Sequence, residues 1–190
     1  MPSQLVKEKL VQYFNEALAM ENAAADRIQS RIGETPVEQA KQQLLQYHLE
    51  QTIQQQERLK DIITNLGGSP TGAKASLPKL APMTMDTISN TVKEAAKSIT
   101  SEEDRKVMDA EKELIRTKED AIIENAEIAS YKMLVEIASK AGLSETVPAL
   151  QQSLQEETAM ANFILGNTPL VLTTLWPKLE APATTKATQA

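Results

Sequence analysis

The chain has 190 residues, of which 41% are hydrophobic and 3% aromatic, and it carries a net charge of −6. A negative chain without dense runs of Lys or Arg repels a phosphate backbone, so nucleic acid is not an expected partner. The absence of cysteine excludes disulfides, a thiolate nucleophile and iron–sulfur clusters, so any metal has to be bound through oxygen and nitrogen atoms.

The length suits one packed domain, and we expect residues 1–179 to form it and residues 180–190 to be a disordered tail. The low content of glycine and aromatic residues, with many Ala, Gln, Glu, Leu and Ile, predicts an all-α fold. The N-terminus lacks an apolar signal region, and no stretch approaches about 18 apolar residues. We therefore expect a cytoplasmic protein without a membrane span.

Two helices are predicted in the first third of the chain. The first starts after Ser3, whose side chain can cap free N–H groups, and stops at Gly33. Thr35 and Glu38 then form a capping box with a proline between them, which is a strong start signal for the second helix. This helix is expected to continue to about Leu66.

A long connection follows the second helix. Glycines and prolines break every helical period between residues 67 and 82, so this segment is predicted to be a crossover along the bundle. A short extra helix is expected over residues 85–99.

Two further main helices are predicted in the second half. A capping box at residues 100–103 opens a long helix, which ends at Gly142. Ser144 can cap the last main helix, which ends near residue 165, before an apolar stub at residues 169–176 that packs on its own bundle or on a second subunit. A helix pair, a long crossover and a second helix pair follow one another along the chain. This is the connectivity of the ferritin-like antiparallel four-helix bundle.

Acidic residues lie within the apolar stripes of these helices. The motif Glu-Asn-Ala occurs at residues 21–23 and again at 124–126, which indicates an internal duplication, and both glutamates point toward the predicted core. Glu127 lies one turn beyond the second motif, and the last helix offers Glu156 and Glu157. One interior therefore receives four or five carboxylate candidates.

Buried carboxylates need compensation. An ionised carboxylate in a dry core costs several kcal/mol, and several together also repel one another. Glutamates from different helices at mid-bundle, with an i, i+3 pair such as Glu124 and Glu127, are how di-iron and di-manganese bundles are built. We therefore predict a metal site with the ligand candidates Glu21, His48, Gln51, Glu124, Glu127, Glu156 and Glu157.

The second helix is polar at its inward positions but has no acid there. Gln51 offers a neutral amide oxygen, and His48, the only histidine, can be a ligand or a donor to one. Single acids at the edge of an apolar stripe are usually solvated, and a single histidine is equally often an ordinary core residue. The repeated motif and the Glu124/Glu127 pair favour the metal site over this simpler interpretation.

The pattern resembles the ferritin-like metal-binding family typified by the bacterial stress-induced YciE/YciF proteins, which are related in fold to rubrerythrins. The resemblance spans residues 5–165. It rests on ALAMENA around Glu21, HLEQT with ERL from His48, EIASY from Glu127 and QEETAMA from Gln155.

The resemblance implies a carboxylate-bridged di-iron fold that forms homodimers, with Glu21, Glu124, Glu127 and Glu156 or Glu157 at the acidic positions of the family. Members usually carry Glu where Gln51 stands and often His where Gln55 stands. The chain departs from the family pattern at these two ligand positions of the second helix.

Two functions are consistent with these features. The first is a bundle that binds one or two ions of iron, manganese or zinc and oxidises or stores ferrous iron or removes peroxide, as a di-iron oxidase or peroxidase. The second is a non-catalytic, stress-related structural or interaction protein that keeps the fold with a degraded metal site, which the glutamines of the second helix favour. Protection of DNA in the manner of miniferritins is disfavoured by the net charge.

Overall fold

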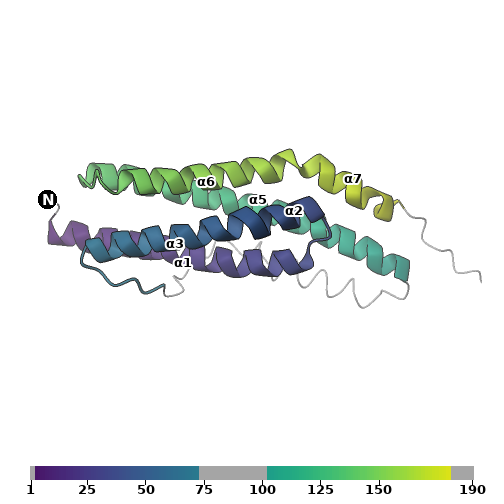
Figure 1. Ribbon diagram of the computed structural model, residues 1–190, viewed down its shortest axis with the longest axis horizontal. Helices are drawn as coiled ribbons and strands as arrows, with labels where there is room; N and C mark the ends of the chain where they lie inside the picture. Colours follow the sequence, from purple (N-terminus) through teal and green to yellow (C-terminus); the bar gives the residue numbers. More distant parts are fainter. Residues whose placement is uncertain (1–2, 73–101, 181–190) are drawn as a thin grey trace, which may run out of the picture.

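The computed structural model describes residues 3–72 and 102–180. These residues form an all-helical bundle, shown in Figure 1, whose elements are α1 (Gln4–Glu34), α2 (Glu38–Gln43), the π-helical turn η1 (Leu44–His48), α3 (Leu49–Asn65), α5 (Glu102–Lys140), α6 (Val147–Gly166) and α7 (Thr168–Leu179). Helices α1 and α6 run in one direction and α3 and α5 in the other, so each half is an antiparallel pair (Figure 1). The predicted all-α, ferritin-like four-helix bundle is confirmed.

Some predicted features lie outside the described residues. They are the short helix at 85–99, most of the crossover, the start of the capping box at 100–103 and the tail from 181 onward. Within the described part of the chain, no helix combines the length and hydrophobicity that a membrane span needs.

The first helix begins as predicted but ends later. The Ser3 side chain accepts a hydrogen bond from the Val6 N–H at 3.4 Å. Gly33 does not end the helix, contrary to the prediction, and α1 continues until Thr35 adopts an extended conformation with ψ of 130°. The cause is Pro36, because proline disfavours helical geometry in the preceding residue and has no N–H to continue the ladder.

Two of the predicted helix caps are wrong. Thr35 accepts the Val37 N–H at 3.3 Å but donates its own proton to Glu113 at 2.7 Å, and α2 begins after Val37 without a side-chain cap. Ser144 does not cap α6 either, because a turn separates them and the helix begins after Thr146, again without a side-chain cap. The end of α5 at Gly142 is confirmed, with φ of 74° in the left-handed region that glycine tolerates.

The second helix contains a feature that the sequence analysis did not predict. It continues from α2 to α3 through η1, where the hydrogen bonds widen to the π pattern. Such a turn inserts one extra residue and changes which side chains face the core. His48 is the last residue of η1, so this local irregularity sets the position of the only histidine.

Apolar side chains form three buried clusters along the bundle. The largest lies near the N-terminal half of α1, the second lies around Ile28 and Leu44, and the third lies where α7 meets α5. In the third cluster, Val171 and Leu175 of α7 pack with Val37 and Ala110. The apolar stub is therefore a helix that packs on its own bundle.

Candidate metal centre

Four glutamates from three helices meet in the interior of the bundle. Glu21 comes from α1, Glu124 and Glu127 come from α5, and Glu157 comes from α6; their exposed fractions lie between 1% and 5%. On α1, the apolar residues of the largest cluster precede Glu21 and those of the second cluster follow it. The acids therefore form a polar layer enclosed by apolar packing, where charge is poorly solvated.

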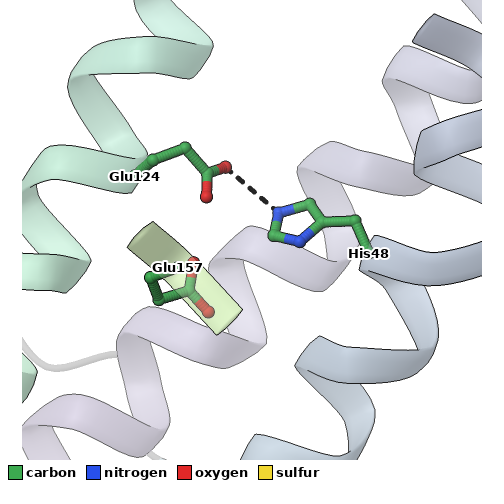
Figure 2. Close-up of side chains that lie close together, drawn as sticks. All are labelled: His48, Glu124 and Glu157. Carbon is green, nitrogen blue, oxygen red and sulfur yellow. Dashed lines mark hydrogen bonds and ion pairs between the residues drawn. The ribbon is translucent and has the colours of Figure 1, made fainter. Parts of the chain in front are cut away.

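His48 completes a group of three potential ligands with two of these acids. Its Nε2 atom lies 3.1 Å from Oε1 of Glu124. One ligand atom each of His48, Glu124 and Glu157 lies within 4.8 Å of the other two, and Figure 2 shows the three side chains converging from different helices. Imidazole with carboxylates is a donor set that suits iron, manganese and zinc.

Several buried polar atoms of this layer have no hydrogen-bond partner among the described residues. They are Oε2 of Glu21, Nδ1 of His48, Oε1 of Gln55, Oε2 of Glu124, Oε1 of Glu127 and Oε2 of Glu157. Buried polar atoms are normally hydrogen-bonded, and each exception needs an explanation. These six occur in one layer, where protons shared between carboxyl groups or a partner from outside the chain can satisfy them, and their donor chemistry fits a metal ion.

We call Glu21, His48, Gln55, Glu124, Glu127 and Glu157 the acidic cluster. In the described part of the chain, no lysine or arginine forms an ion pair with its four glutamates. Their hydrogen bonds go to other groups, among them the Tyr131 hydroxyl, which donates to Oε1 of Glu21 at 2.6 Å.

Burial raises the pKa of every carboxyl group in the acidic cluster. The pKa of Glu21 rises from 4.5 to about 8 because of burial and then the charge of Glu157. Burial likewise raises the pKa of Glu124 to about 7, and burial with the charge of Glu124 raises the pKa of Glu157 to about 8. The pKa of Glu127 rises through burial and then through the charge of Glu21. Without another cation, the cluster therefore retains protons near neutral pH.

Burial also acts on the two other titratable groups of this layer. It lowers the pKa of His48 below 6.5, which favours the neutral imidazole that binds metals. It raises the pKa of Tyr131, and the neighbouring Glu21 carboxylate raises it further, so the phenol remains a hydrogen-bond donor. A cavity of about 20 Å³ borders His48 and Glu124, which is room for about one water molecule or ion.

Two of the predicted ligands, Glu156 and Gln51, lie outside the acidic cluster. Glu156 faces Arg58, with its Oε2 atom 2.6 Å from Nη1 of the guanidinium, so its charge is already balanced. Gln51 is half-buried. Gln55, by contrast, is fully buried and its Nε2 donates to Oε1 of Glu157. The inward glutamine of α3 is therefore Gln55, which the sequence analysis did not place among the ligand candidates.

Sequence reasoning also missed a second group of charges, buried or half-buried, which we call the arginine cluster. It consists of Arg27, Arg31, Glu113, Glu119 and Asp120. Arg31 donates two hydrogen bonds of 2.9 Å to Glu113 and a third of 2.8 Å to Asp120. Burial alone lowers the pKa of Arg31, but its hydrogen bond to Glu113 and the charge of Asp120 outweigh it and raise the pKa above its usual value.

Solved structures with the same fold support this architecture. A protein of Xanthomonas campestris pv. campestris is similar with a TM-score of 0.63 and 21% identity, over 93% of this chain and 99% of that one. A bacterioferritin of Desulfovibrio desulfuricans, whose diiron site has been studied in different catalytic states, is similar with a TM-score of 0.60 and 19% identity, over 97% of this chain and 95% of that one.

Sequence comparison gives one further finding. Residues 6–173 match the family described as a domain of unknown function, DUF892. No curated protein matches the chain.

Proposed function

We propose that the acidic cluster of this chain, which belongs to the DUF892 family and has the ferritin-like fold, binds iron. The observation that carries the proposal is the convergence of His48, Glu124 and Glu157 in a buried layer in which six polar atoms lack hydrogen-bond partners among the described residues. A divalent cation there would displace the retained protons and satisfy these atoms at once. Iron is preferred over manganese and zinc because the similar bacterioferritin carries a diiron site.

His48, Glu124 and Glu157 would hold the first ion. Glu21 and Glu127 each have an unpartnered buried oxygen and would provide the oxygen ligands of a second ion. Bound iron would supply one-electron chemistry toward dioxygen or peroxide, which fits oxidation of ferrous iron or removal of peroxide.

The protein's own contribution is positioning, exclusion of water and control of protons. The apolar clusters on both sides keep the layer dry, which strengthens every electrostatic interaction within it. Tyr131 holds one oxygen of Glu21 through its 2.6 Å hydrogen bond and leaves the second oxygen free for an ion. His48 is neutral at pH 7 because its pKa is lowered, so metal binding does not have to displace a proton from the ring.

Elemental analysis tests the proposal directly. The full-length protein is expressed with iron, manganese and zinc available, beside a Glu124→Gln/Glu157→Gln variant and an exposed control, Glu136→Gln. We expect one to two iron ions per chain in the wild type and the control, and background metal in the double variant. Background metal in all three proteins would overturn the proposal and favour the non-catalytic alternative, in which protons balance the cluster.

Three expectations from the sequence remain predictions alongside this proposal. They are a homodimer, a role in stress and a cytoplasmic location. Sedimentation equilibrium of the purified protein, with and without added ferrous iron, tests the first of them, and a monomer under both conditions would contradict it.

A further inference from the structure

Gln55 connects the acidic cluster to a carboxylate outside it. Its side chain is completely buried on α3. The amide nitrogen donates one hydrogen bond to Oε1 of Glu157 and another to Oε2 of Glu156 at 3.1 Å. Both N–H groups are thus directed at α6, whereas the amide oxygen has no partner among the described residues.

The orientation of this amide is determined by Glu156. Arg58 donates to both of its oxygens, with distances of 2.6 Å from Nη1 to Oε2 and 2.9 Å from Nη2 to Oε1. The side chains of Arg58 and Glu156 are only 15% and 13% exposed, so this two-pronged pair is shielded from solvent. Gln152 donates a further hydrogen bond to Oε1 at 3.0 Å. Glu156 is therefore a fixed acceptor for one N–H group of the Gln55 amide.

Among the described residues, no hydrogen bond or ion pair joins Arg58 to the acidic cluster directly. It lines a cavity of about 690 Å³ between the end of α3 and the connection from α5 to α6, and its Nη1 also donates to Ser153 at 3.2 Å. Arg58, Glu156, Gln55 and Glu157 thus form one continuous hydrogen-bonded chain from this cavity to the metal centre.

We propose that Arg58 and Glu156 are positioning residues, which act through Gln55 to fix the carboxylate of Glu157 for metal binding. This inference rests on the proposed function. Gln55 holds one oxygen of Glu157 and leaves the other, Oε2, without a hydrogen-bond partner among the described residues and available to an ion. Groups that orient a metal ligand in this way contribute to affinity although they do not touch the metal.

These hydrogen bonds explain why a glutamine suits position 55. A carboxylate at this position would face Glu156 and Glu157 without a proton to donate to either. The amide avoids that repulsion and supplies the two donors that the neighbouring acids accept. In this protein, Gln55 is a specific partner of the pair formed by Glu156 and Arg58.

Cobalt(II) titration of the chelator-treated full-length protein tests the inference, because cobalt reports its ligand geometry through visible absorption. The variants are Gln55→Ala, Arg58→Gln and Arg58→Lys. The control is Arg116→Gln, which removes a partly exposed ion pair to Glu34 of 2.8 Å far from this chain of bonds. We expect Gln55→Ala and Arg58→Gln to weaken cobalt binding about 10- to 100-fold and to change the spectrum.

Arg58→Lys retains the charge but loses the two-pronged geometry, so its affinity should lie between those of the wild type and Arg58→Gln. Arg116→Gln should bind cobalt as the wild type does. If Gln55→Ala and Arg58→Gln lower the melting temperature of the metal-free protein but keep wild-type affinity and spectrum, the residues are structural and the inference is wrong. If the wild type itself binds no cobalt, the proposed metal centre fails and the inference fails with it, which is a distinct result.

Discussion

The bundle holds two groups of buried and half-buried acidic side chains, and it balances their charge in different ways. In the arginine cluster, Arg31 lies against Glu113 and Asp120 with hydrogen bonds of 2.8 to 2.9 Å. In the acidic cluster, four glutamates lie against one another, with a neutral histidine as the only basic side chain. The two clusters are neighbours, because one cavity of about 20 Å³ borders Arg27, Arg31 and Asp120 as well as His48 and Glu124.

The difference separates a structural use of buried charge from a binding use. A carboxylate that has a guanidinium partner is already satisfied and has little to offer a ligand. A carboxylate without one must hold a proton or bind a cation from solution. Mutation of the arginine cluster is therefore expected to change the free energy of unfolding whether or not metal is present. The contribution of the acidic cluster to this free energy should depend on metal and on pH.

The largest effect is expected when the arginine cluster is broken. Arg31→Met leaves Glu113 buried with Thr35 as its remaining donor. Loss of one partner from a buried ion pair costs about 3–5 kcal/mol. Urea unfolding in the presence of a chelator should show a loss of this size in the free energy of unfolding.

Arg116→Gln is the matched control, because it breaks a partly exposed ion pair with Glu34 and should cost at most about 1 kcal/mol. A loss below about 1 kcal/mol for Arg31→Met would contradict the structural role assigned to the arginine cluster.

The next largest effect is expected from metal at the acidic cluster. Ferrous iron, kept reduced, at a free concentration of about 100 times its dissociation constant should raise the free energy of unfolding by about 2.7 kcal/mol. The free energy of unfolding rises because the ion binds only to the folded chain. Thermal unfolding under anaerobic conditions, with and without iron, measures the difference.

The Glu124→Gln/Glu157→Gln variant should lose this stabilisation, and Arg31→Met should keep it because its substitution lies in the other cluster. Equal stabilisation of the double variant and the wild type would place the ion elsewhere.

A smaller effect is expected from pH on the metal-free protein. The folded pKa values of about 7 for Glu124 and about 8 for Glu21 and Glu157 lie above the value of 4.5 for the unfolded chain. Between about pH 4.5 and 8 the folded state therefore binds more protons than the unfolded state, and the free energy of unfolding falls as pH rises. The lowered pKa of His48 acts in the opposite direction, but only below about pH 6.5.

Between pH 6.5 and 7.0 only the carboxyl groups should contribute, and we expect the free energy of unfolding to fall by about 2 kcal/mol. Urea unfolding at these two pH values measures the change. The Glu124→Gln/Glu157→Gln variant should show a smaller fall, and saturating metal should reduce the fall in the wild type. A stability that rises with pH would show that the carboxyl groups are not protonated in the folded protein.

The sequence predicted the fold and most of the interior acids because both depend on helical periodicity. The stripes around Glu21 and Glu124, and the breaks at the crossover and at Gly142, were sufficient for a bundle with one crossover. Glu157 and His48 were candidates on the same grounds. Local signals alone were less reliable, since the predicted roles of Gly33 and Ser144 were overturned by Pro36 and by a turn before α6.

The remaining features depend on contacts between distant segments. Arg31 and Glu113 lie on separate helices and look like ordinary charged residues in the sequence. Glu156 and Glu157 are neighbours on α6, and only the position of Arg58 shows that the first is balanced by a protein cation. The π-helical turn η1 leaves no clear mark in the sequence, yet it changes which side chains of the second helix face inward.

The smallest predicted effect concerns the side chains that η1 turns toward or away from the core. Gln51 was a ligand candidate, but it is half-buried, and Gln55 is the glutamine that lies in the acidic cluster. We expect Gln51→Ala to change the cobalt(II) affinity by less than about twofold, or about 0.4 kcal/mol, because no hydrogen bond links its side chain to the described ligands.

Gln55→Ala, measured in the same titration, provides the contrast, since its amide contacts Glu157 directly. If Gln51→Ala weakened binding as strongly as Gln55→Ala, the second helix would have to rotate when metal binds, so that position 51 enters the site. Its π-helical turn would then be the point of adjustment, because such turns interrupt regular helix geometry and are frequent at functional sites. Unchanged affinity would mean that the observed phase of α3 is the one that binds metal.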